Sequence, residues 1–229
     1  MKFDGGPNEV FITFMVGKIR RFLSDSDKEN AITRALGTEN WKHIRNLNES
    51  ENIESQILKL YTSKLKNDAG AEYVFPFRMM HPDRRLTAYY LIHTTNNFKG
   101  LKVMKDIMFG SGSKGNFAYL GQDHYGFGDN QQSLTESTGA KDARIDQLEE
   151  YLLKMFSGEQ LRLWDILKHT YAETDLIEKH YRKALKNLEE RGEIQILNFP
   201  ERPDGTENGL QTDDEILFSP KDTKLSNWT

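Results

Sequence analysis

The chain has 229 residues, with 31 Lys and Arg against 35 Asp and Glu, a formal charge of −4 and a pI near 5.9. This length accommodates one large domain or two small ones. The sequence has no cysteine, which excludes disulfides, thiolate zinc sites, a cysteine nucleophile and a cysteine-ligated iron–sulfur cluster in this chain. No apolar run in the sequence is long enough to span a bilayer, and no secretory pattern opens it. We therefore expect a cytoplasmic protein without membrane association.

Strand-like and helix-like patterns alternate in the first half of the chain. The β-branched and aromatic residues of Glu9–Phe14 predict a buried strand. Apolar residues at helical spacing then predict four helices, at about residues 15–23, 28–36, 39–44 and 52–65.

A hairpin pattern and another helix follow. Residues 72–79 and 86–93 both have strand patterns and flank a polar turn, which predicts a β-hairpin. Apolar spacing over residues 97–109 predicts an amphipathic helix, with Asn96 or Asn97 as its N-cap. The fold class expected for this half is α/β.

The second half has a different pattern. Residues 110–143 lose periodicity and are rich in Gly, Ser, Asn, Gln and Thr, and within them residues 128–143 are the predicted linker. Three helical patterns and two strand patterns follow, the order of a winged helix. The predicted helices are 145–156, 164–171 and 174–191, and the predicted strands are 193–199 and 215–218. The domain prediction is a partial α/β domain at 1–127, a linker at 128–143, a winged helix at 144–219 and a tail at 220–229.

Basic residues recur on one face of the third predicted helix of the winged helix. At i, i+3, i+4 and i+7 these are Lys179, Arg182, Lys183 and Lys186. The corresponding helix enters the major groove in DNA-binding members of this class. Against DNA, the residues from Arg144 onward include 18 acidic and 12 basic side chains, and Arg202 stands among acidic residues of the predicted wing. Nucleic acid and protein therefore both stay open as partners.

A second group of basic residues surrounds the first hairpin and the helix after it. Its members are Arg78, Arg84, Arg85, Lys99, Lys102 and Lys105. We interpret the group as a solvated surface, because no aromatic residues for base stacking are placed beside it. A nucleic-acid surface is the alternative.

His93, Asn96 and Asn97 come at the end of a predicted strand. That position often faces a ligand crevice in open α/β sheets. The alternative interpretation is that these side chains cap the next helix and satisfy backbone groups. The six histidines show no metal-ligand spacing, and we assign no catalytic, cofactor-binding or metal-ligating residue.

Several segments, in the same order along the chain, resemble the three-Cys-motif partner (TcmP) proteins. They are NEVFITFMVGKIRRFL from Asn8, YVFPFRM from Tyr73, YYLIHTTNNFKGLKVMKDIM from Tyr89, FAYLG from Phe117 and IEKHYRKALKNLEERGEI from Ile177. The resemblance implies a class I methyltransferase-type Rossmann domain followed by a winged helix. It also implies a separate radical-SAM-like partner protein that carries three cysteines.

The sequence departs from the family at its beginning. The glycine-rich β–α turn that would hold S-adenosylmethionine in the family has no counterpart, because only MKFDGGP precedes the first matching segment. We expect the last three strands of the methyltransferase-like sheet, without the first four. S-adenosylmethionine is then a cofactor only if an upstream half completes the sheet. An open sheet edge exposes unpaired backbone groups, which predicts pairing with another chain, self-association included.

Two functions remain after this comparison. The leading hypothesis is a non-catalytic, TcmP-like accessory protein that acts through a winged-helix interaction module. The alternative is the C-terminal part of an S-adenosylmethionine-dependent methyltransferase-like enzyme whose cofactor-binding half is missing or separately encoded.

Overall fold

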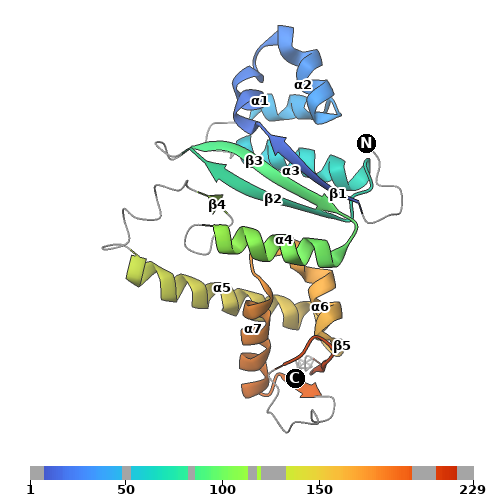
Figure 1. Ribbon diagram of the computed structural model, residues 1–229, viewed down its shortest axis with the longest axis vertical. Helices are drawn as coiled ribbons and strands as arrows, with labels where there is room; N and C mark the ends of the chain where they lie inside the picture. Colours follow the sequence, from blue (N-terminus) through green and yellow to red (C-terminus); the bar gives the residue numbers. More distant parts are fainter. Residues whose placement is uncertain are drawn as a thin grey trace, which may run out of the picture. The chain divides into compact units, whose positions relative to one another are not determined.

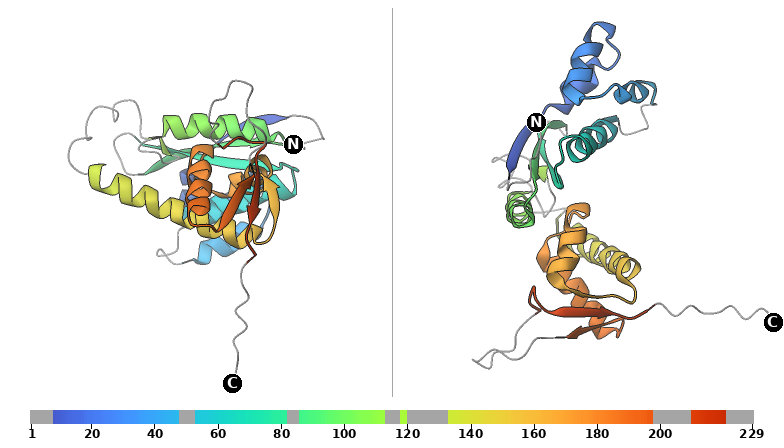
Figure 2. Two further views of the ribbon diagram at one scale, coloured as in Figure 1. Left: turned by 90° about the horizontal axis from the view of Figure 1, so that it is seen from below. Right: turned by 90° about the vertical axis from the view of Figure 1, so that its right-hand side faces the viewer.

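The chain divides into two units, Met1–Gly128 and Asp129–Thr229, which are described separately. The computed structural model (Figures 1 and 2) describes six stretches of the chain, which are residues 8–47, 53–81, 86–112, 118–119, 133–197 and 210–220. The side chains of 118–119 and 133–143 are not part of this description. In the described stretches, no helix is both long enough and apolar enough to cross a membrane.

A mixed sheet organises the first unit. Its strands, in the spatial order β1-β3-β2-β4, are β1 (Glu9–Phe14), β3 (Thr87–Thr95), β2 (Tyr73–Met80) and β4 (Ala118–Tyr119). Strand β3 is antiparallel to both β1 and β2, so β1 and β2 run parallel to each other. The predicted first strand and the predicted hairpin are confirmed. The short strand β4, parallel to β2, was not predicted.

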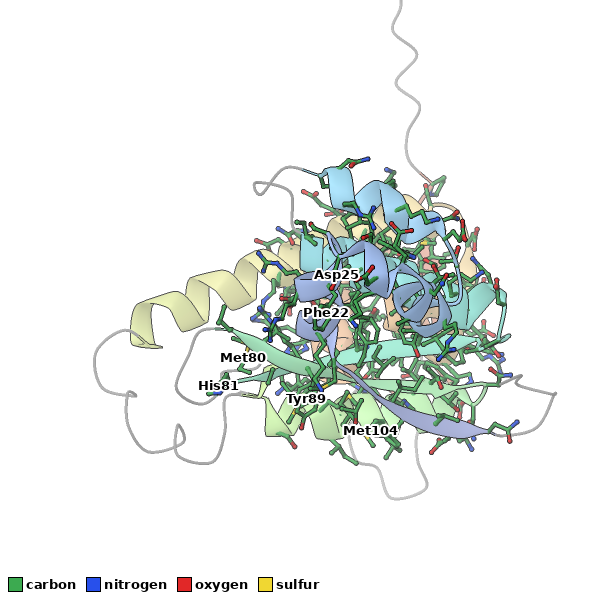
Figure 3. All side chains as sticks on the ribbon, turned by 90° about the horizontal axis from the view of Figure 1, so that it is seen from above. Phe22, Asp25, Met80, His81, Tyr89 and Met104 are labelled. Carbon is green, nitrogen blue, oxygen red and sulfur yellow. The ribbon has the colours of Figure 1, made fainter. Side chains whose placement is uncertain are left out.

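Helices pack on both faces of this sheet. On one face the chain forms α1 (Val16–Phe22), α2 (Glu29–Leu36), a 3-10 helix (Asn40–Asn46) and α3 (Ile53–Asn67). The opposite face is covered by α4 (Phe98–Ser111). Figure 3 shows Phe22 of α1 and Met104 of α4 on the two sides of the sheet. These five helical segments agree with the apolar periodicity of the sequence.

Strand β1 is covered on one face. Phe14 belongs to the core cluster that includes Ile57 of α3, and the alternate residues Val10 and Ile12 are partly buried against this cluster. The intervening residues of β1 are exposed, and Phe11 is 46% exposed. The prediction of a buried strand is therefore correct for only one of its two faces.

The second unit is a helical bundle with a small sheet. Its helices are α5 (Ser133–Phe156), α6 (Leu163–Thr170) and α7 (Glu178–Glu190), and its strands are β5 (Gln160–Arg162), β6 (Ile194–Leu197) and β7 (Glu215–Phe218). The antiparallel sheet has the order β5-β7-β6. Three helices followed by an antiparallel hairpin form a winged helix, as the sequence predicted.

Two helix starts in this unit differ from the prediction. Helix α5 begins at Ser133, inside the segment predicted as a linker, because an established helix extends by one hydrogen bond per residue and needs no apolar face to do so. Helix α7 begins at Glu178, not at Thr174. Thr174 is extended, and its hydroxyl lies 2.9 Å from the Tyr181 hydroxyl instead of capping a helix.

Candidate functional site: helix α7 of the winged helix

Helix α7 has one fully buried face and one exposed face. The buried face consists of Tyr181, Ala184, Leu185 and Leu188, all with zero exposure. On the other side, Lys179, Lys183 and Lys186 are exposed. Their i, i+4, i+7 spacing places the three amines along one line of the helix. We call these three residues the lysine line.

Arg182 differs from the lysine line in its surroundings. Its Nε donates a hydrogen bond to Oε1 of Glu178 at 2.8 Å, and the Glu178 side chain is only 15% exposed. The ion pair joins residues one helical turn apart. The Arg182 guanidinium is therefore paired within α7.

Aromatic hydroxyls hold the turn that leads into α7. Tyr171 accepts a hydrogen bond from the Glu178 amide at 3.1 Å, and its ring lies 5.8 Å from that of Tyr181. His180 accepts from the Ile177 amide through Nδ1 at 3.0 Å. Burial raises the pKa of Tyr181 to about 12, so the phenol stays protonated at neutral pH. The start of α7 is therefore fixed by core contacts, and the lysine line is held on an ordered support.

A pocket of about 230 Å³ lies between α5 and the turn before α7. Its lining includes Arg144 and Tyr151 of α5 and Asp175 of the turn. Burial and the nearby charge of Glu173 raise the pKa of Tyr151. The opposite charges of Arg144 and Asp175 give this pocket no preference for anions, in contrast to the lysine line.

In the first unit, Asn96 and Asn97 are engaged with the backbone. The Asn96 side chain accepts a hydrogen bond from the Glu72 amide at 2.7 Å, and the Asn97 side chain accepts from the Lys99 amide at 3.0 Å. Asn97 is therefore the N-cap of α4, one of the two positions that the sequence predicted.

His93 lies in the layer between the sheet and α4. It is 1% exposed and stands beside Phe11 of β1 and Phe75 of β2 in the strand register. Neither ring nitrogen has a hydrogen-bond partner. Burial lowers the pKa of His93, and the charge of Glu9 acts in the opposite direction. A buried, apolar environment of this kind holds a neutral imidazole.

The structure describes only part of the basic group around the first hairpin, and one of its members is buried. Lys105 of α4, predicted to be solvated, is fully buried, with Nζ 5.1 Å from the centre of the Phe75 ring of β2. The aliphatic stem of a lysine can pack in an apolar core, so the charge of the residue alone does not predict its exposure. Arg84 and Arg85 lie outside the described residues, as does Arg202 of the predicted wing.

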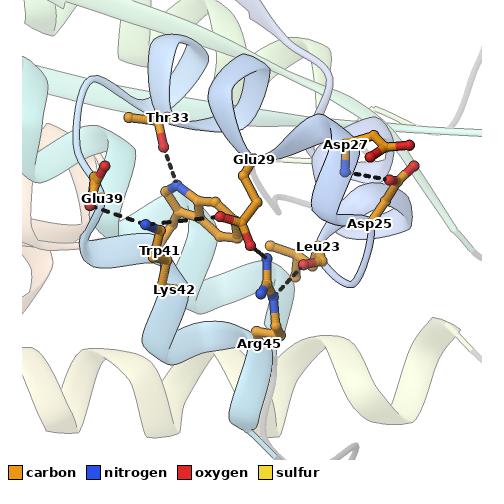
Figure 4. A network of polar contacts seen from close by, with 9 residues as sticks. All are labelled: Leu23, Asp25, Asp27, Glu29, Thr33, Glu39, Trp41, Lys42 and Arg45. Carbon is orange, nitrogen blue, oxygen red and sulfur yellow. Dashed lines mark hydrogen bonds and ion pairs between the residues drawn. The ribbon is translucent and has the colours of Figure 1, made fainter.

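A polar network in the first unit is satisfied by its own members (Figure 4). Arg45 donates to the Leu23 carbonyl and to Glu29, both at 2.7 Å, and lies over the Trp41 ring. The Arg45 hydrogen bond holds the pKa of Glu29 below its usual value. Trp41 donates through Nε1 to the Thr33 hydroxyl at 2.9 Å. We assign this network to stability, because its groups are directed at one another.

Within the described stretches, no group of three His, Asp or Glu side chains is placed to hold a metal ion. The lysine line is therefore the clearest candidate for contact with a partner.

The second unit is a winged helix-turn-helix domain. The family model described as the GMT-like wHTH domain matches residues 123–199, which supports the same assignment from sequence. Neither the curated proteins nor the solved structures contain a match to this chain.

Proposed function

We propose that this protein is a non-catalytic, TcmP-like accessory protein whose winged helix binds a negatively charged partner through the lysine line. The observation that carries the proposal is the exposure of Lys179, Lys183 and Lys186 on one line of α7, opposite its buried face. Nucleic-acid phosphates and the carboxylates of an acidic protein surface share the chemistry that such a line recognises.

The TcmP-like part of the proposal rests on both units. The match to the GMT-like wHTH domain supports the C-terminal part of the resemblance. In the first unit, parallel β1 and β2 with helices on both faces are in keeping with a residual Rossmann-like sheet, since mixed sheets occur among doubly wound folds. We further propose a cytoplasmic location and a radical-SAM-like partner, whose cluster ligands come from that partner because this chain has no cysteine.

The charge of the surroundings limits the strength of binding to nucleic acid. Three lysines neutralise about three phosphates, which corresponds to a slope of about −3 in log K against log salt. We therefore expect moderate affinity that falls steeply as salt rises.

Charge reversal on α7 tests the proposal. Fluorescence anisotropy with labelled duplex DNA, single-stranded RNA and polyglutamate compares the native chain with the Lys183→Glu/Lys186→Glu variant. A matched control, Lys154→Glu/Lys168→Glu, changes the charge equally at exposed lysines on α5 and α6. We expect at least a tenfold loss of affinity for one probe in the α7 variant and less than a threefold loss in the control. Equal losses in both variants would refute a specific role for the lysine line, and the affected probe identifies the partner class.

A second candidate function rests on the open edge of β1. In the alternative, the chain is the C-terminal part of an S-adenosylmethionine-dependent methyltransferase-like enzyme, completed by a separately encoded half. Calorimetric titration of the purified chain with S-adenosylmethionine tests the accessory function. The accessory function predicts no binding heat, whereas tight one-to-one binding would overturn it.

A further inference from the structure

Among the strands that the structure describes, β1 lies at the edge of the first unit's sheet. In the described stretches it pairs only with β3, so its other edge faces no strand. Natural edge strands are usually protected by Pro, by Lys or by a bulge. The strand EVFITF has neither of these residues, its pairing with β3 is continuous, and its one charge is at Glu9. Phe11, at the middle of the strand, is 46% exposed.

Helix α4 adds apolar surface beside this edge. Gly100 lies against Glu9 of β1, since a Cβ at Gly100 would stand 1.9 Å from Oε1 of Glu9. The side of α4 that carries Gly100 is thus the side next to β1. Met104 and Ile107 follow at i+4 and i+7 on this side, and Ile107 is 53% exposed. Exposed apolar side chains from a strand and a helix therefore flank the same edge.

We propose that a second copy of this chain pairs with this edge, β1 against β1, across a two-fold axis. A two-fold axis makes the two strands antiparallel and requires a self-complementary register. Centred on Phe11, the register sets Phe11 opposite its own copy, Val10 opposite Ile12 and Glu9 opposite Thr13. The charge pattern suits this register, because each Glu9 faces a neutral threonine and the two carboxylates stay apart.

The pairing also covers the exposed apolar side chains. The two Phe11 rings form a cross-strand aromatic pair on the face that carries α4 in each copy. The strips of Met104 and Ile107 from the two α4 helices then lie on either side of that pair. The sheet continues from β3 through β1 into the second copy with the same antiparallel pairing that joins β1 to β3. This inference is independent of the lysine line and does not need the proposed function.

Cysteine cross-linking tests the register, because the native chain contains no cysteine. Directly opposed residues have Cα atoms about 5 Å apart, which suits a disulfide. Under mild oxidation, Phe11→Cys should give mostly dimer on a non-reducing gel. Thr13→Cys alone should give almost none, since the two copies of residue 13 are about 13 Å apart along the strands. A mixture of Glu9→Cys and Thr13→Cys chains should cross-link as a heterodimer. Equal cross-linking of Phe11→Cys and Thr13→Cys alone would overturn the register.

Light scattering after size exclusion tests the dimer itself. The native chain should show a concentration-dependent approach to twice its monomer mass, and Phe11→Lys/Thr13→Lys should halve the mass at equal concentration. Leu86→Lys is the control, because Leu86 is 58% exposed and lies outside β1. Circular dichroism establishes that each variant folds. A native chain that stays monomeric at every concentration would overturn the proposal. Any partner of the β1 edge would then be a different protein. The Lys183→Glu/Lys186→Glu variant should still dimerise, so this result and the test of the lysine line are separable.

Discussion

The carboxylate of Glu149 on α5 lies 2.8 Å from Nη1 of Arg191, the residue that follows α7. Glu149 also accepts a hydrogen bond from the side chain of Asn187 at 2.7 Å, and its side chain is 3% exposed. Bonds between a charged acceptor and its donors are stronger than neutral ones. This contact joins the first and third helices of the winged helix and so supports the helix that carries the lysine line.

Loss of Arg191 should destabilise the second unit. In Arg191→Ala the buried carboxylate keeps only the donor on Asn187, which should lower the free energy of unfolding by about 2 kcal/mol. Glu193→Ala removes only the exposed partner of Arg191 and should cost less than about 0.5 kcal/mol. Urea denaturation followed by circular dichroism measures both. Equal costs would show that the buried carboxylate does not depend on Arg191.

The indole of Trp41 should depend on Thr33. Thr33→Val removes the acceptor for a fully buried N–H, and we expect a loss of about 1–2 kcal/mol. In a Trp41→Phe background no such donor exists, and the same change should cost less than half as much. A double-mutant cycle by chemical denaturation measures the difference. Additive effects would show that the hydrogen bond contributes nothing to stability.

His93 should make the first unit less stable in acid. Burial lowers its pKa in the folded state below the ordinary histidine value of 6.5, so the unfolded chain binds the proton more tightly. Stability should fall as the pH decreases through 6.5 and should level off below the folded pKa. The charged groups nearby are Glu9, which opposes this effect, and Lys105 across the Phe75 ring.

Substitution of the imidazole isolates this effect. Urea midpoints at pH 7.5 and pH 5.5 should differ less in His93→Phe than in the native chain. An unchanged difference would assign the acid sensitivity to other groups.

Gly100 should be coupled to Glu9. Alanine is about 1 kcal/mol more favourable than glycine inside a helix. In the native chain a Cβ at position 100 displaces the Glu9 carboxylate, so Gly100→Ala should gain little. With Glu9→Ala also present, the same change should stabilise by about 0.5–1 kcal/mol. Thermal denaturation of the four variants checks this, and equal gains in both backgrounds would contradict the close approach.

The elements predicted correctly from the sequence are those with a regular apolar periodicity. The hairpin of β2 and β3, helix α4 with its cap at Asn97, and the helix order of the winged helix all have apolar repeats that match their period. Strand β4 was missed because two residues show no period, and its pairing with β2 depends on residues distant in sequence. Helix α5 extends into a polar segment in which no apolar face marks a start.

In the candidate site too, the sequence predicted what depends on helical spacing and missed what depends on side-chain contacts. Helical spacing placed the basic residues of α7 on one face, but the ion pair of Arg182 with Glu178 depends on side-chain geometry that spacing does not specify. Burial of Lys105 was missed because lysine is rarely buried. Glu149 did offer a signal, since it lies at i+4 from buried Ile145 and thus on the core face of α5.

The fully buried indole of Trp41 has an optical consequence. It is the single tryptophan among residues 1–128, and the other two, Trp164 and Trp228, belong to the second unit. In a chain with phenylalanine at 164 and 228, indole fluorescence reports on the first unit alone. One emission band then follows the melting of the sheet, and the winged helix contributes no tryptophan signal to it.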